Sequence, residues 1–189
     1  MTTGAPIAGV TWGHVQRHGD QRGSFREVWR ESRFPRLTAD LTGTGGARFS
    51  QANVSTSDTG VLRGLHCHRR QLDHWIVLDG RAFVALVDIR PALQGGRPVV
   101  ETREVDAGAT VTIPVGVAHG FLALSPLTLL DLVTNEYDGS DELGFAWDDP
   151  HVGVPWPATI RTSDGRPILS ERDQRNPSLE QLIASVRAP

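Results

Sequence analysis

The chain contains no lysine, because all 19 of its basic residues are arginine. Arginine stays protonated in proteins and cannot serve as a Schiff-base amine or as an ordinary proton donor. Any mechanism that needs a lysine is therefore excluded. Tyrosine and cysteine are almost missing as well, with Tyr137 and Cys67 the single examples. One cysteine excludes an intrachain disulfide and is typical of a cytoplasmic protein.

Long apolar runs and a strong charge imbalance are also missing. No stretch of about 18 apolar residues could span a membrane, and residues 1–5 lack the basic-then-apolar order of a signal peptide. A net charge of −3 gives no reason to expect nucleic acid or an anionic membrane as partner. With 189 residues, 39% hydrophobic and 22% charged, the chain is expected to be a single domain over residues 1–189 with a substantial core.

Short β-patterned runs alternate with Gly, Pro and Asp turns, which predicts an all-β sandwich or barrel. The predicted strands are 49–57, 74–78, 81–89, 98–105, 110–114, 120–124 and 127–135. Helical patterns are expected only at 31–41, where Pro35 interrupts, and at 178–186, where apolar residues share one face. The tryptophan-containing stretch 147–157 is expected to be an irregular connection packed on the barrel.

A cluster of histidines carries the chemistry of this sequence. Residues two apart on a strand share a face, so His66 and His68 are expected to point into the barrel and Cys67 away from it. A lone buried histidine is usually a hydrogen-bonded core residue, but several histidines with an acid at barrel spacing favour a functional site. His74 would face the opposite side of its strand from Asp73 and is left out of the site.

Two spaced motifs resemble those of the cupin superfamily. They are Gly60-x5-His66-x-His68-x4-Asp73-x6-Gly80 and Gly108-x5-Pro114-x-Gly116-x2-His119. The resemblance implies a cupin-type jelly-roll β-barrel with a few short peripheral helices. It also implies that His66, His68, Asp73 and His119 could bind a divalent metal, although glutamate is usual where Asp73 stands.

A closer resemblance extends over roughly residues 20 to 175. The sequence is similar to the dTDP-4-dehydrorhamnose 3,5-epimerase family in these segments: Asp20-x-Arg22-Gly23-x-Phe25-x-Glu27, Gln51-x-Asn53-x-Ser55, 60–66, 87–90, 118–121, 147–150, Trp156-Pro157 and 169–173. This family implies a jelly-roll cupin that is usually a homodimer and needs no metal. It also implies inversion of the carbons beside the C4 ketone of a dTDP-4-keto-6-deoxyhexose.

The same resemblance assigns roles to individual residues. His66 matches the family's catalytic base and Asp173 the carboxylate that orients it. The remaining matches are to positions that hold the sugar and its diphosphate: Arg22, Glu27, Gln51, Asn53, Arg63 and His119. The fork of donors in arginine suits a diphosphate, although Arg22 could instead form an ordinary surface salt bridge.

Two residues depart from the family pattern. Asp73 stands where the family has a lysine near the substrate ketone, and Asp131 stands where it has a proton-donating tyrosine. A carboxylate beside an enolate would repel it, at a cost of several kcal/mol, which is orders of magnitude in rate.

Three hypotheses follow from these departures. The first is an epimerase that inverts C3, with or without C5, and stabilises the enolate through His119, His68 or an arginine. The second is a metal-dependent cupin enzyme that uses His66, His68, Asp73 and His119, with the metal acting as a Lewis acid. The third is a nucleotide-sugar binding protein without catalysis. A nitrogen of His66 that binds a metal cannot also take a substrate proton, so the first two hypotheses give His66 different roles.

Overall fold

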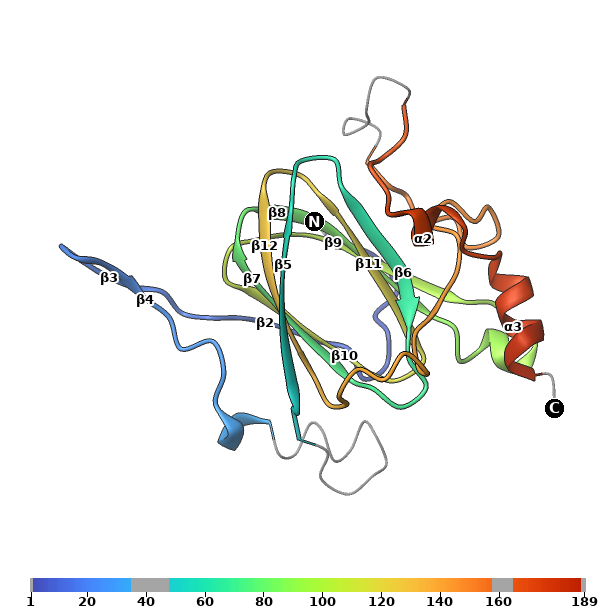
Figure 1. Cartoon of the computed structure of the whole chain (residues 1–189), viewed down its shortest axis with the longest axis horizontal. Coiled ribbons are helices and arrows are strands. Elements are labelled where there is room, and N and C mark those ends of the chain that lie inside the picture. The colour runs from blue at the N-terminus through green and yellow to red at the C-terminus, as the bar shows by residue number, and fades with distance from the viewer. Residues whose placement is uncertain (1, 35–47, 158–164, 188–189) are drawn as a thin grey trace.

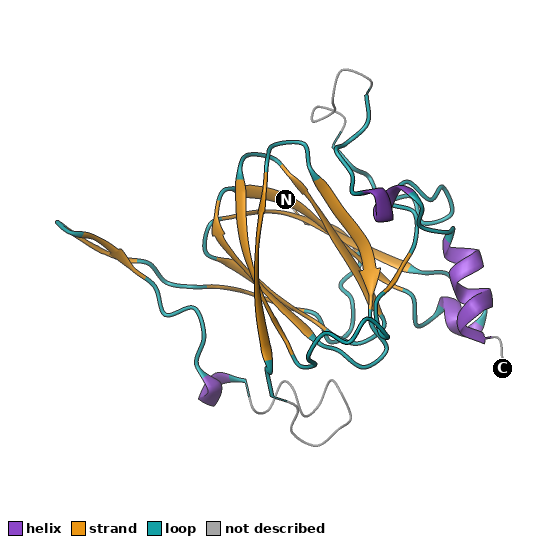
Figure 2. Ribbon diagram, viewed as in Figure 1, coloured by secondary structure: helices purple, strands orange, loops and turns teal. Residues whose placement is uncertain are grey.

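Two antiparallel sheets face each other and form a flattened barrel (Figures 1 and 2). The structure is a computed structural model that describes residues 2–34, 48–157 and 165–187. One sheet has the strand order β1-β9-β8-β11-β6-β13 and the other β2-β10-β7-β12-β5. The predicted all-β jelly roll with short peripheral helices is confirmed.

The strands in chain order are β1 (Thr2–Gly4), β2 (Thr11–His14), β3 (His18–Asp20), β4 (Gly23–Phe25), β5 (Gln51–Ser57), β6 (Leu62–Cys67), β7 (Asp73–Asp79), β8 (Arg81–Asp88), β9 (Val99–Asp106), β10 (Ala109–Ile113), β11 (Val117–Ala123), β12 (Leu127–Val133) and β13 (Leu143–Gly144). The helices are the 3₁₀ turns η1 (Glu31–Arg33) and η2 (Ala92–Gln94) and the α-helices α2 (Glu171–Gln174) and α3 (Leu179–Arg187).

Strand β8 shows how the sequence builds two apolar layers. It is buried on both faces, so its sequence reads as an almost continuous apolar run. Val84 and Leu86 join the core between the sheets, where they meet Trp75 and Phe121. Phe83 and Val87 point to the opposite face, since side chains alternate along a strand. The barrel wall therefore needs a covering layer on its outer side.

The C-terminal part of the chain supplies that layer (Figure 1). Leu179 and Leu182 of α3 pack on the outer face of β8 together with Phe145, which is fully buried. The buried carboxylate of Asp149 accepts hydrogen bonds from the backbone N–H groups of Leu179, at 2.7 Å, and His151, at 2.9 Å. The bond to Leu179 ties α3 to the irregular 147–157 stretch, which packs on the barrel as expected.

All seven predicted strands are present, and the predicted helix at 178–186 corresponds to α3. At 31–41 only the short turn η1 is described, and residues 35–47 lie outside the described residues. The exposed strands β2, β3 and β4 were not predicted, because they bury no alternating apolar face. Within the described ranges, no helix is long and apolar enough to cross a membrane.

Candidate active site

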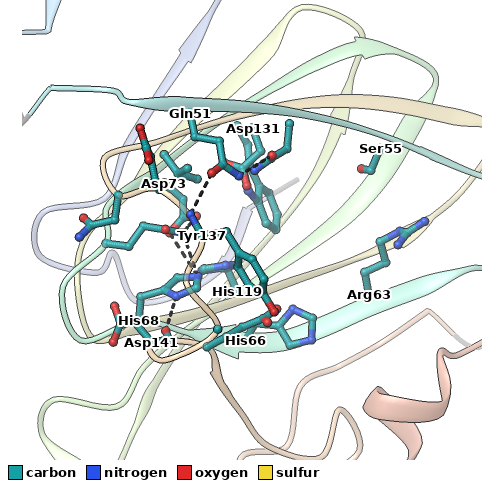
Figure 3. Close-up of a pocket in the computed structure, with 18 of the residues that line it drawn as sticks. Gln51, Ser55, Arg63, His66, His68, Asp73, His119, Asp131, Tyr137 and Asp141 are labelled. Carbon is teal, nitrogen blue, oxygen red and sulfur yellow. Dashed lines mark hydrogen bonds and ion pairs between the residues drawn. The ribbon is translucent and has the colours of Figure 1, made fainter.

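A cavity of about 440 Å³ opens between the two sheets (Figure 3). This volume is in the range of small-molecule binding sites. Side chains from β5, β6, β7, β11 and β12 line it, together with the 135–142 segment and α2. Among them are six of the residues selected from the sequence: Gln51, Asn53, Arg63, His66, His119 and Asp173. His68 and Asp73 line it as well.

A bulge in β6 positions two of these side chains. His66 pairs with His119 of β11 and Arg63 pairs with Phe121, so two residues of β6, Gly64 and Leu65, face one of β11, Gly120. The bulge lies at Gly64, which has φ +123° and sits against the backbone of Gly120. Because of this extra residue, Arg63 and His66 both reach the cavity although they are three apart, a spacing that would separate them on a regular strand.

His66 and Asp173 form a hydrogen-bonded pair at the cavity wall. Nε2 of His66 lies 2.6 Å from Oδ1 of Asp173, which α2 presents from 107 residues further along the chain. Ser170 caps that helix by accepting a hydrogen bond from the backbone N–H of Asp173. Burial by itself raises the pKa of Asp173, but its bonds with His66, Ser170 and the backbone of Gly64 outweigh that effect and lower its pKa below the ordinary value. Asp173 is therefore a carboxylate that can orient and polarise His66.

The deep end of the cavity collects two imidazoles and two carboxylates (Figure 3). His68 and His119 lie with their ring centres 5.5 Å apart, and Asp73 is within 3.8 Å of His68. Burial raises the pKa of Asp73 to about 6, although His68 and Gln71 oppose that shift.

Two further residues of the cluster have shifted pKa values. Burial and the nearby charge of Asp73 raise the pKa of Asp131 well above its ordinary value. Burial, reinforced by His68 and His66, lowers the pKa of His119 well below its ordinary value.

Three of the four residues in the metal set expected from the cupin motifs lie together in the structure. His68, Asp73 and His119 place their ligand atoms within 4.8 Å of one another, and His66 is not part of this group. The reason is the bond to Asp173, which holds Nε2 of His66. The structure therefore gives His66 and the other two histidines different surroundings.

Several polar residues at the cavity mouth were not selected from the sequence. Arg70, Arg172, Tyr137 and Asp141 all line the cavity. Arg70 follows the His66–His68 motif and Arg172 precedes Asp173, so adjacency to motif residues could have indicated both. The backbone of Tyr137 donates to Gln51 at 2.9 Å, and Gln51 donates to Asn53 at 2.8 Å.

Four residues lie away from the cavity lining. Arg22 and Glu27 belong to the segment around the β3–β4 hairpin, which projects from the barrel (Figure 1). His74 is buried against Phe34 and bonded to Thr112, as expected for a residue outside the site. Cys67 is buried in the outer apolar layer, and burial raises the pKa of its thiol to about 12.

The chain as a whole can be compared with known proteins. The family model of dTDP-4-dehydrorhamnose 3,5-epimerase matches residues 4–181. The chain belongs to the dTDP-4-dehydrorhamnose 3,5-epimerase family. The dTDP-4-dehydrorhamnose 3,5-epimerase of Sinorhizobium fredii is 33% identical to this chain over 187 residues. The match covers 96% of this chain and 90% of the Sinorhizobium protein. This family acts without a cofactor.

Solved structures of epimerases share the fold over nearly the whole chain. An epimerase from Mycobacterium tuberculosis has a TM-score of 0.81 and 31% identity, covering 100% of this chain and 93% of that one. A 3'-monoepimerase from Streptomyces bikiniensis, solved in complex with dTDP-quinovose, has a TM-score of 0.79 and 27% identity, covering 97% and 91%. The similarity includes an epimerase described as acting at one carbon.

Proposed function

We propose that this chain, acting as a single domain, is an isomerase that epimerises a dTDP-4-keto-6-deoxyhexose at C3, with or without C5. The observation that carries the proposal is the His66–Asp173 pair in the wall of a cavity large enough for a sugar. Membership of the epimerase family supports it, as does the monoepimerase with its bound dTDP-sugar.

His66 is suited to be the base. Asp173 is ionised, so Nε2 of His66 donates its hydrogen to the carboxylate and Nδ1 carries the free lone pair. Nδ1 can take the proton from the carbon beside the ketone, and Asp173 then stabilises the imidazolium that forms. Return of a proton to the opposite face of the same carbon inverts it.

The cavity mouth is suited to an anionic nucleotide. Arg63, Arg70 and Arg172 line it, and each guanidinium offers several donors to a diphosphate. Arg70 now bonds Ser140 at 2.7 Å and lies 3.6 Å from Asp138, and Arg172 forms an ion pair with Glu142, so a diphosphate would replace these acidic partners. Gln51 and Asn53 from β5 complete a polar wall that can hold the sugar hydroxyls. No nucleic acid or membrane partner is part of the proposal, and a cytoplasmic location is consistent with the single buried thiol.

Hydrogen exchange at the sugar tests this function. Incubation of the protein with a dTDP-4-keto-6-deoxyhexose in heavy water should place deuterium at C3, because the enolate is reprotonated from solvent. Mass spectrometry and NMR would locate the label, and label at C5 would show a second inversion. Absence of label at both carbons under saturating substrate would reject the epimerase and leave a nucleotide-sugar binding protein.

The projecting segment supports a proposal that the protein is a homodimer. Phe25 and Trp29 are 68% and 42% exposed there, and a lone two-stranded hairpin is only marginally stable in water. Packing this segment on a second copy would bury both rings. It would also carry Arg22 and Glu27 towards the other copy, where they could serve the substrate roles expected of them.

We expect the double variant Phe25→Ser and Trp29→Ser to shift the protein from dimer to monomer. The physical reason is the loss of two large apolar side chains from the interface. Sedimentation velocity at micromolar concentration would measure the shift. Ile168→Ser is a matched control, since Ile168 is 47% exposed on a different part of the chain. A wild-type monomer, or a double variant that still dimerises, would contradict the proposal.

A further inference from the structure

Three metal-ligand side chains from different segments meet on the floor of the cavity. His68 follows β6, Asp73 begins β7 and His119 lies in β11. One ligand atom from each lies within 4.8 Å of the other two. All three are shielded, with side-chain exposures of 12% for His68 and 3% for Asp73 and with His119 buried. Their convergence depends on the fold, since His119 is far from the other two in sequence.

Hydrogen bonds to the backbone fix which imidazole nitrogens face the cluster. Nδ1 of His68 lies 2.6 Å from the carbonyl oxygen of Asp141, and Nδ1 of His119 lies 3.3 Å from that of Val117. A carbonyl oxygen can only accept, so both Nδ1 atoms carry the hydrogen and both Nε2 atoms present lone pairs. Metal-binding histidines have this arrangement, in which the second nitrogen donates to a carbonyl or carboxylate.

The acceptor atoms on the cavity floor receive few hydrogen bonds from the described residues. Gln71 donates to Oδ1 of Asp73 at 2.9 Å and lies 3.2 Å from Nε2 of His68. Among the described residues, no hydrogen bond reaches Nε2 of His119 or Oδ2 of Asp73. Oδ2 of Asp73 and Nε2 of His68 are 3.8 Å apart, too far for a hydrogen bond between them. A cation between these atoms would satisfy the remaining lone pairs.

The side chain of Asp131 adds a further buried acceptor beside the cluster. Oδ1 of Asp131 is buried and has no hydrogen-bond partner among the described residues. Neither Asp131 nor Asp73 forms an ion pair with an arginine in the described ranges, and the chain has no lysine. The floor of the cavity is therefore rich in acceptors and poor in fixed cations, where the proposed reaction develops a negative enolate.

We propose that this protein binds one divalent first-row transition metal ion through Nε2 of His68, Nε2 of His119 and the carboxylate of Asp73. Two imidazoles and a carboxylate suit Mn²⁺, Fe²⁺, Co²⁺, Ni²⁺ or Zn²⁺ and leave coordination positions open towards the cavity. The use of the site rests on the proposed function: the open positions would accept the C4 ketone oxygen and stabilise the enolate as a Lewis acid. The chain would then differ from its family, which acts without a cofactor.

Metal binding can be measured without substrate. The full chain is treated with a chelator, which is then removed, and titrated with Mn²⁺, Co²⁺ or Zn²⁺ in a calorimeter. We expect about one ion per chain for at least one of these metals. His68→Gln and Asp73→Asn should each weaken that binding at least about 100-fold. Circular dichroism and thermal melting show whether each variant is folded. If one variant fails to fold, the metal affinity of the other tests the proposal.

Two histidine variants make the test specific. His66→Ala should retain the metal although it removes the proposed base, and His151→Ala should retain it because that side chain is 82% exposed and does not line the cavity. The metal proposal is overturned if the wild type binds none of the three ions, or if His68→Gln and Asp73→Asn both bind as the wild type does. Metal binding without deuterium exchange would instead reject the epimerase alone, and full exchange by metal-free protein would reject the ion's role as Lewis acid.

Discussion

His66→Ala is expected to lower the rate of deuterium incorporation at C3 by about 10³- to 10⁴-fold. The substitution removes the group that takes the substrate proton and leaves the cavity otherwise intact. The fold should persist, because β6 pairs with β11 and β13 through its backbone. Deuterium incorporation at saturating substrate, followed by NMR, would measure the loss.

Three comparisons assign that loss to the His66–Asp173 pair. His151→Ala is the matched histidine control and should exchange at the wild-type rate. Asp173→Asn should lose about 10²-fold, because the amide cannot stabilise the imidazolium, and should alter the pH profile of exchange, which loss of packing alone would not do. Dissociation of a bound dTDP-sugar should change much less in both variants. Exchange by His66→Ala at a tenth of the wild-type rate or more would exclude His66 as the base.

The fold was largely predictable because its strands bury one or both faces. Apolar alternation places β5 and β7 to β12 within a few residues of where the structure has them, since a buried strand must alternate or be apolar throughout. Strands β2, β3 and β4 are mostly exposed, with Trp12 of β2 only partly buried, so their sequences carry no period to detect. Strands β3 and β4 pair only with each other, so no barrel strand imposes an apolar alternation on them.

The site was predictable in part. A spacing of two correctly places His66 and His68 on the cavity side and Cys67 in the outer layer. The same rule cannot place Arg63, because the bulge at Gly64 shifts the strand by one residue. Asp173 could be paired with His66 only through the family resemblance, because 107 residues separate them and α2 has no sequence link to β6. The hydrogen bonds that separate His66 from the metal-ligand group depend on backbone carbonyls, which no motif encodes.

Gly64→Ala is expected to lower the free energy of unfolding by about 3 kcal/mol or more, which corresponds to a melting temperature about 6–12 °C lower. Two effects add. A φ of +123° is unfavourable for alanine, and a Cβ there would lie 2.6 Å from Cα of Gly120 and 2.7 Å from the carbonyl oxygen of His119. Both close neighbours are backbone atoms of β11, so neither strand can accommodate the methyl group without moving. Urea unfolding followed by circular dichroism would measure the change.

A second glycine separates the two effects. Gly95 has φ +88° at the end of η2, but a Cβ there would meet nothing within 4 Å. Gly95→Ala should therefore cost only about 1 kcal/mol, the price of the backbone conformation alone. Gly64→Ala should in addition slow deuterium exchange, because Gly64 lies between Arg63 and His66 and its backbone N–H bonds Asp173. Equal destabilisation by the two variants, with exchange unchanged, would mean that the close approach of β6 and β11 does not position the catalytic pair.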